Sequence, residues 1–540
     1  MTEDGAEASR EHQEWGTDLT NVTFNGVGFR VYAQRPVSVA ELLGYADRWG
    51  DRPHIVQGSR VVTFAELRRL VSDKADRLRG LGISSGDRVL LMGFNSPDWV
   101  VNFWAIVSCG AVPVLANAWW SVEELKDALD LTEPKLVLAD DRALERLPAG
   151  LATAPWPASS GAEESPSVRI ETARVDENAP SVIIFTSGTS GRPKAVLLAH
   201  RSILSGLHML LHITNRLPHQ VAEHHGTTAL HTGPMFHIGG IQTLSRAVIL
   251  GDTLVMPGGR FEPGEAVELM EKWRISRWSA VPTMVSRVLE HPDVFTRDLR
   301  SLRSLTVGGA PITGDFLAKL KAGFPGAEPR VATGYGLTEN GGQATAASGV
   351  DTTERPGTSG RPLPCAEIRI APAQAGQDGE ILVRSPTQML GYVGEAASPV
   401  DEDGWLHTGD LGVLDKNGYL WITGRSKDLI IRGGENIAPA AVEEALNSFP
   451  GVVESAVFGV PNADLGEEVM AVVSVAGGVT TDHLREHLAG RVASFAIPRH
   501  WQLVHDVLPV NHSGKIDKPE IARSARADLA SRLAQNGPIA

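Results

Sequence analysis

The sequence predicts an α/β fold, in which a large N-terminal domain of parallel-type βα layers carries a small barrel-like part and precedes a small, mobile α+β C-terminal domain. Strand-like and helix-like segments alternate over residues 61–115, and a further helix and the strand "KLVLAD" follow, a pattern typical of parallel sheets packed between helices. Short strands and turns follow one another at 378–423, which favours a small antiparallel or barrel-like part. After about residue 427 the pattern changes to compact α+β.

These changes of pattern divide the chain into three parts. The polar start, "MTEDGAEASREHQEWG", has no apolar signal region, and we expect a disordered tail over residues 1–17. The N-terminal domain is expected at 18–426 and the mobile C-terminal domain at 427–540. No run of 18 apolar residues occurs, so no membrane-spanning helix is predicted.

The alternating region carries helix signals of known chemistry. In "SPDWVVNFWAIVSCGA" Ser96 is the expected N-cap and Pro97 takes the first helical position. In "SVEELKDAL" Ser121 and Glu124 have the spacing of a capping box. The intervening strands are predicted in "DRVLLMGF", "VPVLAN" and "KLVLAD".

Composition narrows the class of protein. The chain has 540 residues, of which 42% are apolar and 21% charged, and its net charge is −14. An acidic chain is a poor general binder of nucleic acid, so an anionic ligand must be held by a local site. Only Cys109 and Cys365 are present, which excludes a disulfide framework and points to a reducing compartment. We therefore expect a cytoplasmic protein.

The segment "IFTSGTSGRPKAV" (184–196) has the chemistry of a phosphate-holding loop. Gly188 and Lys194 have the spacing of a Walker loop, but Pro193 and Ala195 replace the glycine and the hydroxyl residue that flank the Walker lysine. Proline has no backbone N–H to offer a phosphate, and alanine cannot bind Mg²⁺. The Walker interpretation therefore fails. A loop of hydroxyls and glycines with one cation still suits a polyphosphate, and the alternative is a simple connector with an exposed lysine.

Further motifs follow this loop and precede it in a recognisable order: "VTFAEL" (62–67), "PMFHIGG" (234–240), "VGGAP" (307–311), "GYGLTE" (334–339), "GWLHTGDLG" (404–412), "GRSKDLIIRGGENI" (424–437) and "LPVNHSGKIDK" (508–518). Over residues 35–520 the chain resembles the adenylate-forming superfamily of acyl-CoA synthetases, luciferases and peptide-synthetase adenylation domains. The resemblance implies an acid–thiol ligase. Such an enzyme uses ATP to form an acyl-adenylate, releases pyrophosphate, and makes a coenzyme A thioester as AMP leaves.

The same resemblance implies a nucleotide site. The β- and γ-phosphates of ATP are expected against Thr186, Ser187, Gly188, Thr189, Ser190, Gly191 and Lys194. The adenine is expected against Gly308, Gly309, Ala310 and Pro311, with Tyr335, between Gly334 and Gly336, stacked on the base. Thr338 should reach the α-phosphate, and Glu339 should bind Mg²⁺ through a hard carboxylate oxygen. Asp410 should accept hydrogen bonds from the ribose hydroxyls with help from Arg425, although read alone it is a turn-capping aspartate.

By the same resemblance, Lys515 is the mobile lysine that bridges the carboxylate and the α-phosphate. Without the resemblance, it is one lysine in a polar turn. Lys427 matches the hinge about which the C-terminal domain moves between the two half-reactions. Gly433 and Gly434, in "RGGENI", should approach the coenzyme A thiol, with Gly434 at the narrow point of its channel.

A His-rich stretch, His224, His225, His231 and His237, invites a zinc interpretation. The spacing fits no common zinc site and no cysteine lies nearby in the sequence. By resemblance, His237 is a wall or gate of the acyl pocket.

The chain departs from the family pattern at three places. Ala195 stands in the phosphate loop where glycine is common, and its methyl group is expected to stiffen that loop. Ala496 stands where many acyl-CoA synthetases place a lysine. Trp119 and Trp120 replace smaller residues, either as a core anchor for the next helix or as a wall of the acyl site or a partner surface.

The acid itself is indicated only by glycines in segments expected to line its pocket: Gly239, Gly240, Gly308, Gly309, Gly334, Gly341 and Gly342. Missing side chains leave volume, which favours a long or bulky apolar acid, polycyclic acids included. The alternative is that these glycines serve only backbone turns.

Several functions compete with a complete acyl-CoA ligase. One is an acyl-AMP ligase that loads a carrier protein. Another is a ligase that mainly transfers an acyl-adenylate supplied by a partner to coenzyme A. A peptide-synthetase domain is disfavoured, because no carrier-domain segment follows residue 520 and "PMFHIGG" has no acidic residue to meet an amino group. A luciferase-like oxidase stays open, as does a homodimer. A non-catalytic binding protein on this fold is disfavoured, because Lys194, Glu339, Asp410 and Lys515 are retained.

Overall fold

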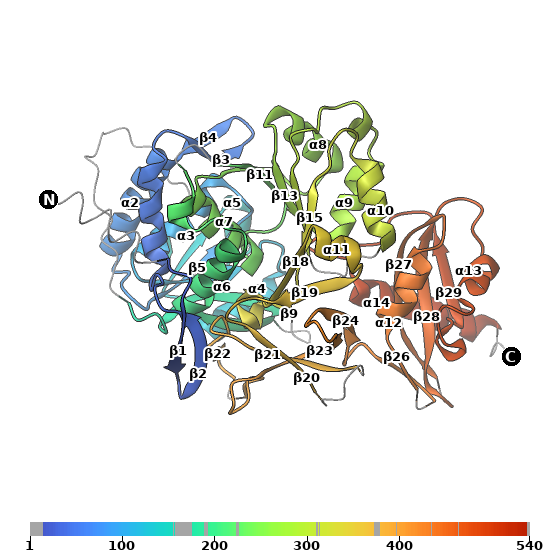
Figure 1. Cartoon of the computed structure of the whole chain (residues 1–540). Coiled ribbons are helices and arrows are strands. Elements are labelled where there is room, and N and C mark those ends of the chain that lie inside the picture. The colour runs from blue at the N-terminus through green and yellow to red at the C-terminus, as the bar shows by residue number, and fades with distance from the viewer. Residues whose placement is uncertain are drawn as a thin grey trace.

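The computed structural model describes residues 15–154, 156, 175–187, 193–222, 226–308, 312, 314–371, 378–395, 397–433, 435–462 and 464–536. Two open sheets and the helices between and around them make up the larger, N-terminal part, and a third sheet with its own helices makes up the smaller, C-terminal part at the right of Figure 1. The predicted α/β class with a small α+β C-terminal part is confirmed. None of the sheets formed by the described strands closes into a barrel.

The first sheet has parallel strands at its centre and two antiparallel strands at one edge. Its order is β22 (Gly391–Tyr392), β10 (Pro193–Ala199), β9 (Pro180–Ser187), β6 (Val112–Ala116), β5 (Arg88–Met92), β7 (Leu136–Ala139) and β8 (Thr153–Ala154). Strands β5, β6 and β7 are the three predicted from the sequence. Their continuous apolar runs fit burial on both faces.

The second sheet joins a parallel half to an antiparallel half. The parallel half is β15 (Arg330–Thr333), β14 (Ser304–Val307), β13 (Arg277–Ala280), β11 (Thr228–His231), β12 (Thr253–Met256) and β3 (Pro53–Gln57), with β4 (Arg60–Thr63) antiparallel at the edge. The antiparallel half is β18 (Thr345–Ser348), β19 (Thr358–Pro362), β24 (Leu420–Arg425), β23 (Leu406–Leu414), β21 (Gly379–Arg384) and β20 (Glu367–Ala371). This half contains the strands predicted at 378–423. It continues the second sheet instead of forming a separate barrel.

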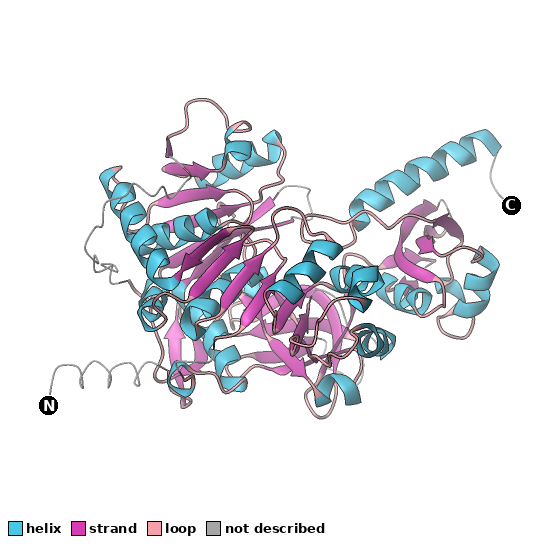
Figure 2. Ribbon diagram, turned by 90° about the horizontal axis from the view of Figure 1, so that it is seen from above, coloured by secondary structure: helices cyan, strands magenta, loops and turns pink. Residues whose placement is uncertain are grey.

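Helices lie between the two sheets and on their outer faces (Figure 2). One apolar cluster joins both sheets through α2 (Phe64–Gly80), α3 (Pro97–Ser108), α6 (His200–Ile213) and α7 (Ile238–Leu250). The outer face of the first sheet packs on α4 (Val122–Thr132), and that of the second on α8 (Pro263–Lys272), α9 (Pro282–Glu290) and α10 (Gly314–Gly323). The parallel parts of both sheets are therefore covered on both faces, as parallel sheets require.

The predicted helix signals form in the structure. The Ser96 hydroxyl accepts a hydrogen bond from the backbone N–H of Trp99 at 3.1 Å, with Pro97 as the first residue of α3. Both bonds of the capping box link Ser121 and Glu124 at the start of α4. These contacts satisfy N–H groups that a helix start leaves without an intrahelical partner.

The C-terminal part is built on a sheet of five strands: β26 (Glu435–Ile437), β25 (Ile430–Arg432), β28 (Gly466–Val475), β27 (Val452–Asn462) and β29 (His500–Val504). Helices α12 (Pro439–Asn447) and α13 (Thr481–Leu488) cover one face of this sheet, and α14 (Lys518–Asn536) covers the other. Figure 2 shows α14 reaching away from the rest of the molecule toward the C-terminus.

The chain makes packing contacts from Trp15 onward, before the end of the predicted tail at residue 17. Residues 1–14 lie outside the described residues, but Trp15 is fully buried and its indole N–H donates to the Tyr45 hydroxyl at 2.8 Å. The Gly16 N–H donates to the carbonyl of Gln34 at 3.0 Å. A tryptophan buries a large apolar area, and burial of this one orders the segment that follows it.

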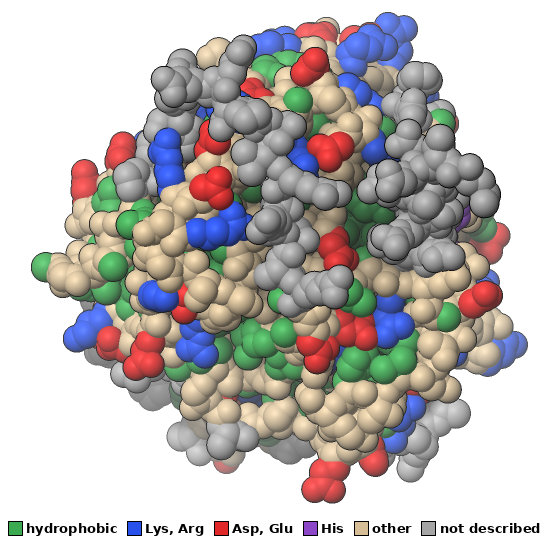
Figure 3. Space-filling model, turned by 90° about the vertical axis from the view of Figure 1, so that its left-hand side faces the viewer, with side chains coloured by type: hydrophobic (Ala, Val, Ile, Leu, Met, Phe, Trp, Pro, Cys, Tyr) green, Lys and Arg blue, Asp and Glu red, His purple; other side chains and the backbone are tan. Residues whose placement is uncertain are grey.

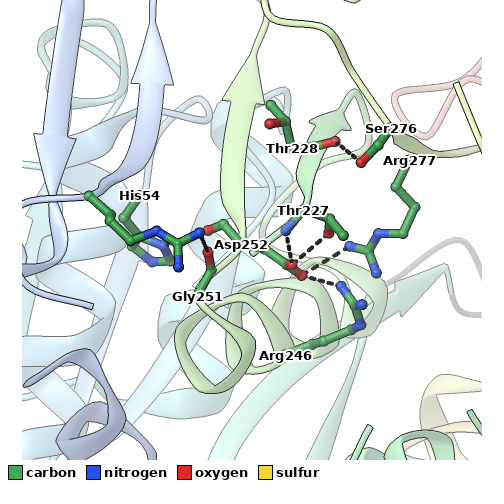
Figure 4. Close-up of polar contacts among 9 residues, drawn as sticks. His54, Thr227, Thr228, Arg246, Gly251, Asp252, Ser276 and Arg277 are labelled. Carbon is green, nitrogen blue, oxygen red and sulfur yellow. Dashed lines mark hydrogen bonds and ion pairs between the residues drawn. The ribbon is translucent and has the colours of Figure 1, made fainter. Parts of the chain in front are cut away.

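Figure 4 shows a buried ion network at the amino ends of β11, β12 and β13. The carboxylate of Asp252 is fully buried and accepts hydrogen bonds from the N–H and hydroxyl of Thr227 at 2.9 and 2.6 Å. Arg246 of α7 and Arg277 of β13 pair with the same carboxylate, the latter at 3.6 Å. Burial alone would raise the pKa of Asp252, but the two arginines lower it. The carboxylate of Asp252 therefore links the amino ends of β11, β12 and β13 to helix α7.

The surface and the cysteines fit the composition. On the face drawn in Figure 3, basic and acidic side chains are interspersed. Cys109 and Cys365 are both buried and unpaired, and burial raises the pKa of their thiols to about 11 and about 12. Among the helices of the described residues, none has the length and apolar character needed to cross a bilayer.

Candidate active site

The candidate site begins where two neighbouring parallel strands end. Gly308 follows β14 and Gly334 follows β15, and these strands pair in parallel. Their carboxyl ends therefore meet at one edge of the second sheet, where open α/β sheets bind ligands. A Cβ atom at Gly308 would meet nothing within 4 Å. Gly309, Ala310 and Pro311 lie outside the described residues.

Asp410 is the most highly connected of the predicted site residues. It lies in β23 directly opposite Arg425 in β24, and the Arg425 Nε donates to its Oδ1 at 2.6 Å. The Tyr335 hydroxyl donates to its Oδ2 at 2.7 Å. Burial followed by the Asp410 charge raises the pKa of Tyr335 well above its usual value, so the phenol keeps its proton. Burial opposes the charge of Arg425, but Asp410 raises its pKa on balance.

The ring of Tyr335 is buried in an apolar cluster with strands of the antiparallel half. Its stacking on an adenine base stays a prediction. A carboxylate can accept about four hydrogen bonds, so Asp410 keeps capacity for further donors beside Tyr335 and Arg425.

A second group of contacts links β10 to the "GYGLTE" segment. Lys194 pairs with Glu395 at 2.9 Å, and its Nζ lies 4.3 Å from the centre of the Tyr392 ring. The Tyr392 hydroxyl donates to Glu339 Oε1 at 3.0 Å. Thr338 and Glu339 open the short helix η4 (Thr338–Asn340). Tyr392 therefore joins the predicted phosphate-loop lysine to the predicted magnesium ligand.

Lys515 lies in a tight turn of the C-terminal part. The Asn511 Oδ1 accepts from the backbone N–H of Lys515 at 3.1 Å, the N–H of Asn511 donates to the Lys515 carbonyl at 2.8 Å, and Gly514 takes φ +79°. The side chain reaches solvent, but the surrounding protein and Arg425 lower its pKa, while Asp410 acts in the opposite direction. The turn therefore lies within electrostatic reach of Arg425 and Asp410.

The predicted pocket residue His237 belongs to an aromatic cluster. It takes the N-cap position of α7 without a side-chain capping hydrogen bond, and its ring centre lies 5.3 Å from that of His512, in the lysine turn. Burial, then the nearby His512 and Lys515, lower the pKa of His237 to about 3. The ring is therefore neutral, as expected of a pocket wall. Burial likewise lowers the pKa of His231 to about 4. His224 and His225 lie outside the described residues.

The structure settles what most of the pocket glycines do. A Cβ at Gly240, Gly334, Gly341 or Gly342 would lie 2.1 to 2.6 Å from existing backbone or side-chain atoms, and the last two take positive φ. These four serve close packing and turns, so they leave no pocket volume. At Gly239 a Cβ would meet nothing within 4 Å, as at Gly308. Gly336 likewise meets the Gly342 carbonyl across the β16 (Gly336–Leu337) and β17 (Gly342–Gln343) hairpin.

The departures from the family pattern have different outcomes. Ala195 is 1% exposed in β10, and its methyl group packs in the core with Phe185 and Trp120. The expectation that this methyl stiffens a loop is therefore wrong, because the residue belongs to a strand. Ala496 is likewise buried. Trp120 is a core anchor in edge contact with Phe185, whereas Trp119 is only partly buried and faces the aromatic cluster.

The remaining predicted residues are placed only in part. Thr186 and Ser187 end β9, while Gly188–Gly191 and Gly434 lie outside the described residues. Lys427 lies in the exposed turn between β24 and β25. Gly433 has φ +58°, and its N–H donates to the Leu465 carbonyl at 2.8 Å. Tyr392, Glu395 and His512 were not predicted. Only Tyr392 had a signal, as an aromatic residue directly after Gly391.

The described residues contain no cluster of three or more His, Cys, Asp or Glu side chains that could hold a metal ion. A zinc site at the His-rich stretch therefore has no support within them. Glu339 is a single carboxylate in contact with Tyr392. Mg²⁺ is commonly held by one or two carboxylates together with substrate phosphates, so this donor set fits magnesium bound with ATP.

Comparison with known proteins identifies the family. The model of the AMP-binding enzyme family matches residues 44–393, and that of the AMP-binding enzyme C-terminal domain matches residues 441–515. The chain belongs to the AMP-binding enzyme family. The match spans Lys194, Glu339 and Lys515, three residues predicted to act on the same ligands.

Several relatives of this AMP-binding enzyme are acyl-CoA ligases. A feruloyl-CoA synthase from Amycolatopsis is 34% identical over 87% of this chain and 96% of its own. A 3-[(3aS,4S,7aS)-7a-methyl-1,5-dioxo-octahydro-1H-inden-4-yl]propanoyl:CoA ligase from Mycobacterium tuberculosis is 34% identical over 87% of this chain and 95% of its own. The solved o-succinylbenzoate CoA synthetase of Bacillus subtilis, in complex with its acyl-adenylate, has a TM-score of 0.76 and 28% identity, and the match covers 89% of this chain and 97% of that one. The protein is accordingly an enzyme of the acyl-CoA ligase type.

Proposed function

We propose that this AMP-binding enzyme joins a bulky, ring-bearing apolar carboxylic acid to coenzyme A in two steps, with an acyl-adenylate as the intermediate. In the first step a carboxylate oxygen bonds to the α-phosphorus of ATP and the bond to pyrophosphate breaks. In the second step a thiol bonds to the acyl carbon and AMP leaves. The observation that carries the proposal is the Asp410–Arg425 pair of the N-terminal part, whose charges also act on Lys515 in the C-terminal part.

In the proposed first step, the residues of this chain hold the nucleotide and balance its charge. Asp410, oriented by Tyr335 and Arg425, accepts hydrogen bonds from the ribose hydroxyls. Lys515 brings a positive charge on a long stem to the α-phosphate, where negative charge gathers as phosphorus is attacked. Lys194 and the hydroxyls of the 186–190 loop act on the leaving pyrophosphate, as cations do in phosphoryl transfer.

Mg²⁺ completes the proposed charge balance. Glu339 would hold it together with phosphate oxygens of ATP. When bound, the ion neutralises phosphate charge during displacement. The role of this chain is to orient the carboxylate, which the Tyr392 hydroxyl does at 3.0 Å.

The proposed second step uses the turn at Lys427 as a hinge and the segment of Gly433 and Gly434 as the approach for the pantetheine arm. Both steps are expected to operate in this protein. The argument for a weak first step depended on Ala195, and the methyl group of Ala195 lies in the core of the first sheet and not in the phosphate site.

The preference for a ring-bearing acid follows from the aromatic residues beside His237 and from the relatives. Phe94, Trp119 and Phe236 present aromatic surface beside His237, with ring centres 4.8 to 5.8 Å apart. Aromatic side chains favour flat, apolar partners through burial and ring–ring contact. The names of two relatives refer to acids that carry rings, feruloyl and an octahydro-indenyl propanoyl group.

The test is a panel of acids with the purified enzyme, ATP, Mg²⁺ and coenzyme A, with thioesters detected by mass spectrometry. The panel should include acetate, a long straight-chain acid, a hydroxycinnamic acid and a bicyclic propanoic acid. The ring-bearing acids should give the highest kcat/KM. A preference for acetate would contradict the proposed class of acid. If the adenylate forms but its acyl group is transferred only to a phosphopantetheinyl carrier protein, the acceptor is that carrier protein and not coenzyme A.

A further inference from the structure

We propose that Trp119 and His512 form a clasp that positions Lys515 for adenylate formation. The two rings belong to different parts of the chain, the N-terminal part and the lysine turn. Their centres lie 6.1 Å apart with an interplanar angle of 26°, and His512 also stacks on His237 at 5.3 Å and 30°. His512 stands three residues before Lys515. This inference rests on the proposed function, in which Lys515 acts in the first step.

The Trp119 side of the clasp is rigid. Its backbone N–H donates to Asn117 Oδ1 at 2.9 Å, directly after β6. The indole ring makes edge contacts with Phe94 at 5.0 Å and with Phe236 at 5.8 Å. Trp120, the next residue, anchors the backbone in the core. A ring held on two edges offers a fixed surface for the incoming His512.

The His512 side of the clasp is held by the turn that carries Lys515. The turn is closed by hydrogen bonds between Asn511 and Lys515, so the backbone of His512 and that of Lys515 move together. The Gly514 carbonyl accepts a hydrogen bond from the Thr283 hydroxyl, which is a second fastening to the N-terminal part. The surrounding protein lowers the pKa of His512, which favours a neutral ring that stacks without a charge to desolvate.

The consequence for the reaction follows from where each step takes place. In the first step Lys515 must stay beside the α-phosphate, so a closed clasp helps. In the second step the C-terminal part must move about Lys427, so the clasp must open. Weakening it should therefore slow adenylate formation and leave transfer from a supplied acyl-adenylate unchanged or faster. A residue that only supports the fold would affect both steps together.

The experiment measures the two half-reactions separately for Trp119→Leu, His512→Leu and the double variant. Pyrophosphate exchange with acid and ATP reports the first step, and thioester formation from synthetic acyl-adenylate and coenzyme A reports the second. Ring contacts of this kind predict a loss of about five- to tenfold in exchange for each single variant. The double variant should lose little more than either single one, because both remove the same contact. Trp119→Phe should recover most of the exchange.

Matched controls separate the clasp from general destabilisation. Trp273→Leu changes another partly buried tryptophan, at the end of α8, and His505→Leu changes a histidine seven residues before His512. Neither should alter the ratio of the two half-reactions. Equal losses in both half-reactions for Trp119→Leu would overturn the clasp. So would fully additive losses in the double variant, or unchanged pyrophosphate exchange in the single variants.

A readout that needs no turnover keeps this inference distinct from the proposed function. Hydrogen–deuterium exchange of the peptide that spans 508–518 should be faster in Trp119→Leu than in the parent protein, because the turn is no longer held. If the parent protein forms no adenylate with any acid, the proposed function fails while this measurement still tests the contact. If both half-reactions proceed in the parent protein but hydrogen–deuterium exchange of this peptide is unchanged in the variant, the clasp is refuted while the proposed function stands.

Discussion

Glu395→Gln is predicted to lower the KM for ATP. In the structure Glu395 holds Lys194 at 2.9 Å, although the proposed task of Lys194 is to meet phosphate oxygens. The lysine must leave this carboxylate when ATP binds, so the ion pair opposes nucleotide binding. A neutral glutamine keeps the size of the side chain and removes the charge that competes with phosphate.

The magnitude follows from the exposure of the pair. The Lys194 side chain is 29% exposed and that of Glu395 is 40% exposed, so solvent screens the attraction. Ion pairs of this kind contribute about 0.2–1 kcal/mol, which corresponds to about a 1.4- to 5-fold decrease in the KM for ATP. kcat should stay within about twofold of the parent value. The Lys194–Glu395 pair is already broken once ATP is bound, so it contributes little to the steps that follow binding.

The assay is steady-state pyrophosphate exchange as a function of ATP concentration, at low and at high salt. The difference between parent and variant should shrink as salt rises, since salt screens exposed charges. Glu402→Gln, an exposed residue in the turn that precedes β23, is the control for loss of one negative charge and should leave KM unchanged. A higher KM for Glu395→Gln would refute the reasoning, because it would show that Glu395 helps Lys194 bind ATP.

Four further predictions test the site. Lys515→Ala should lower pyrophosphate exchange by about 100- to 1000-fold, yet still convert a supplied acyl-adenylate to the thioester; equal losses in both assays would argue against its role in the first step. Because the pKa of Lys515 is lowered, its charge is present at low pH and is lost as pH rises through the lowered value, so exchange should fall on the alkaline side, and in Lys515→Arg that fall should move to higher pH. Gly434→Trp should leave exchange largely intact and block thioester formation, and a matching loss of exchange would exclude the thiol-channel assignment. Ala195→Gly should lower the free energy of unfolding by about 1 kcal/mol, seen as a lower Tm, without raising exchange; a gain in exchange would return Ala195 to the phosphate site.

The sequence predicted the local elements well, because their signals are themselves local. The Ser121–Glu124 capping box and the Ser96–Pro97 start depend on residues three positions apart or fewer, and both form in the structure. The strands at 378–423 were also predicted, but not that they extend the second sheet. That outcome depends on the pairing of β19 with β24, strands about 60 residues apart in the chain, and no local pattern encodes it.

For the site, motif order predicted Asp410, Arg425 and Lys515. In the structure Arg425 pairs with Asp410, and both charges act on Lys515. The sequence could not show that Lys194 pairs with Glu395, because Glu395 is an ordinary glutamate 201 positions away. It also misjudged the glycines. A missing side chain means open space at Gly308 but a close backbone contact at Gly334, and only the fold distinguishes the two. The split between Trp119 and Trp120 has the same cause, since two neighbouring residues face opposite sides.

The buried network around Asp252 places a constraint on how this chain can evolve. Loss of the carboxylate alone would leave Arg246 and Arg277 as two close positive charges, and breaking a buried pair on one side typically costs about 3–5 kcal/mol. A domain's whole stability is only about 5–15 kcal/mol, so such a single step comes near to unfolding the protein. Replacing all partners together by apolar side chains can be neutral. We therefore expect positions 246, 252 and 277 to be inherited as a set, kept intact in one lineage and exchanged together in another, while the surface around them varies freely.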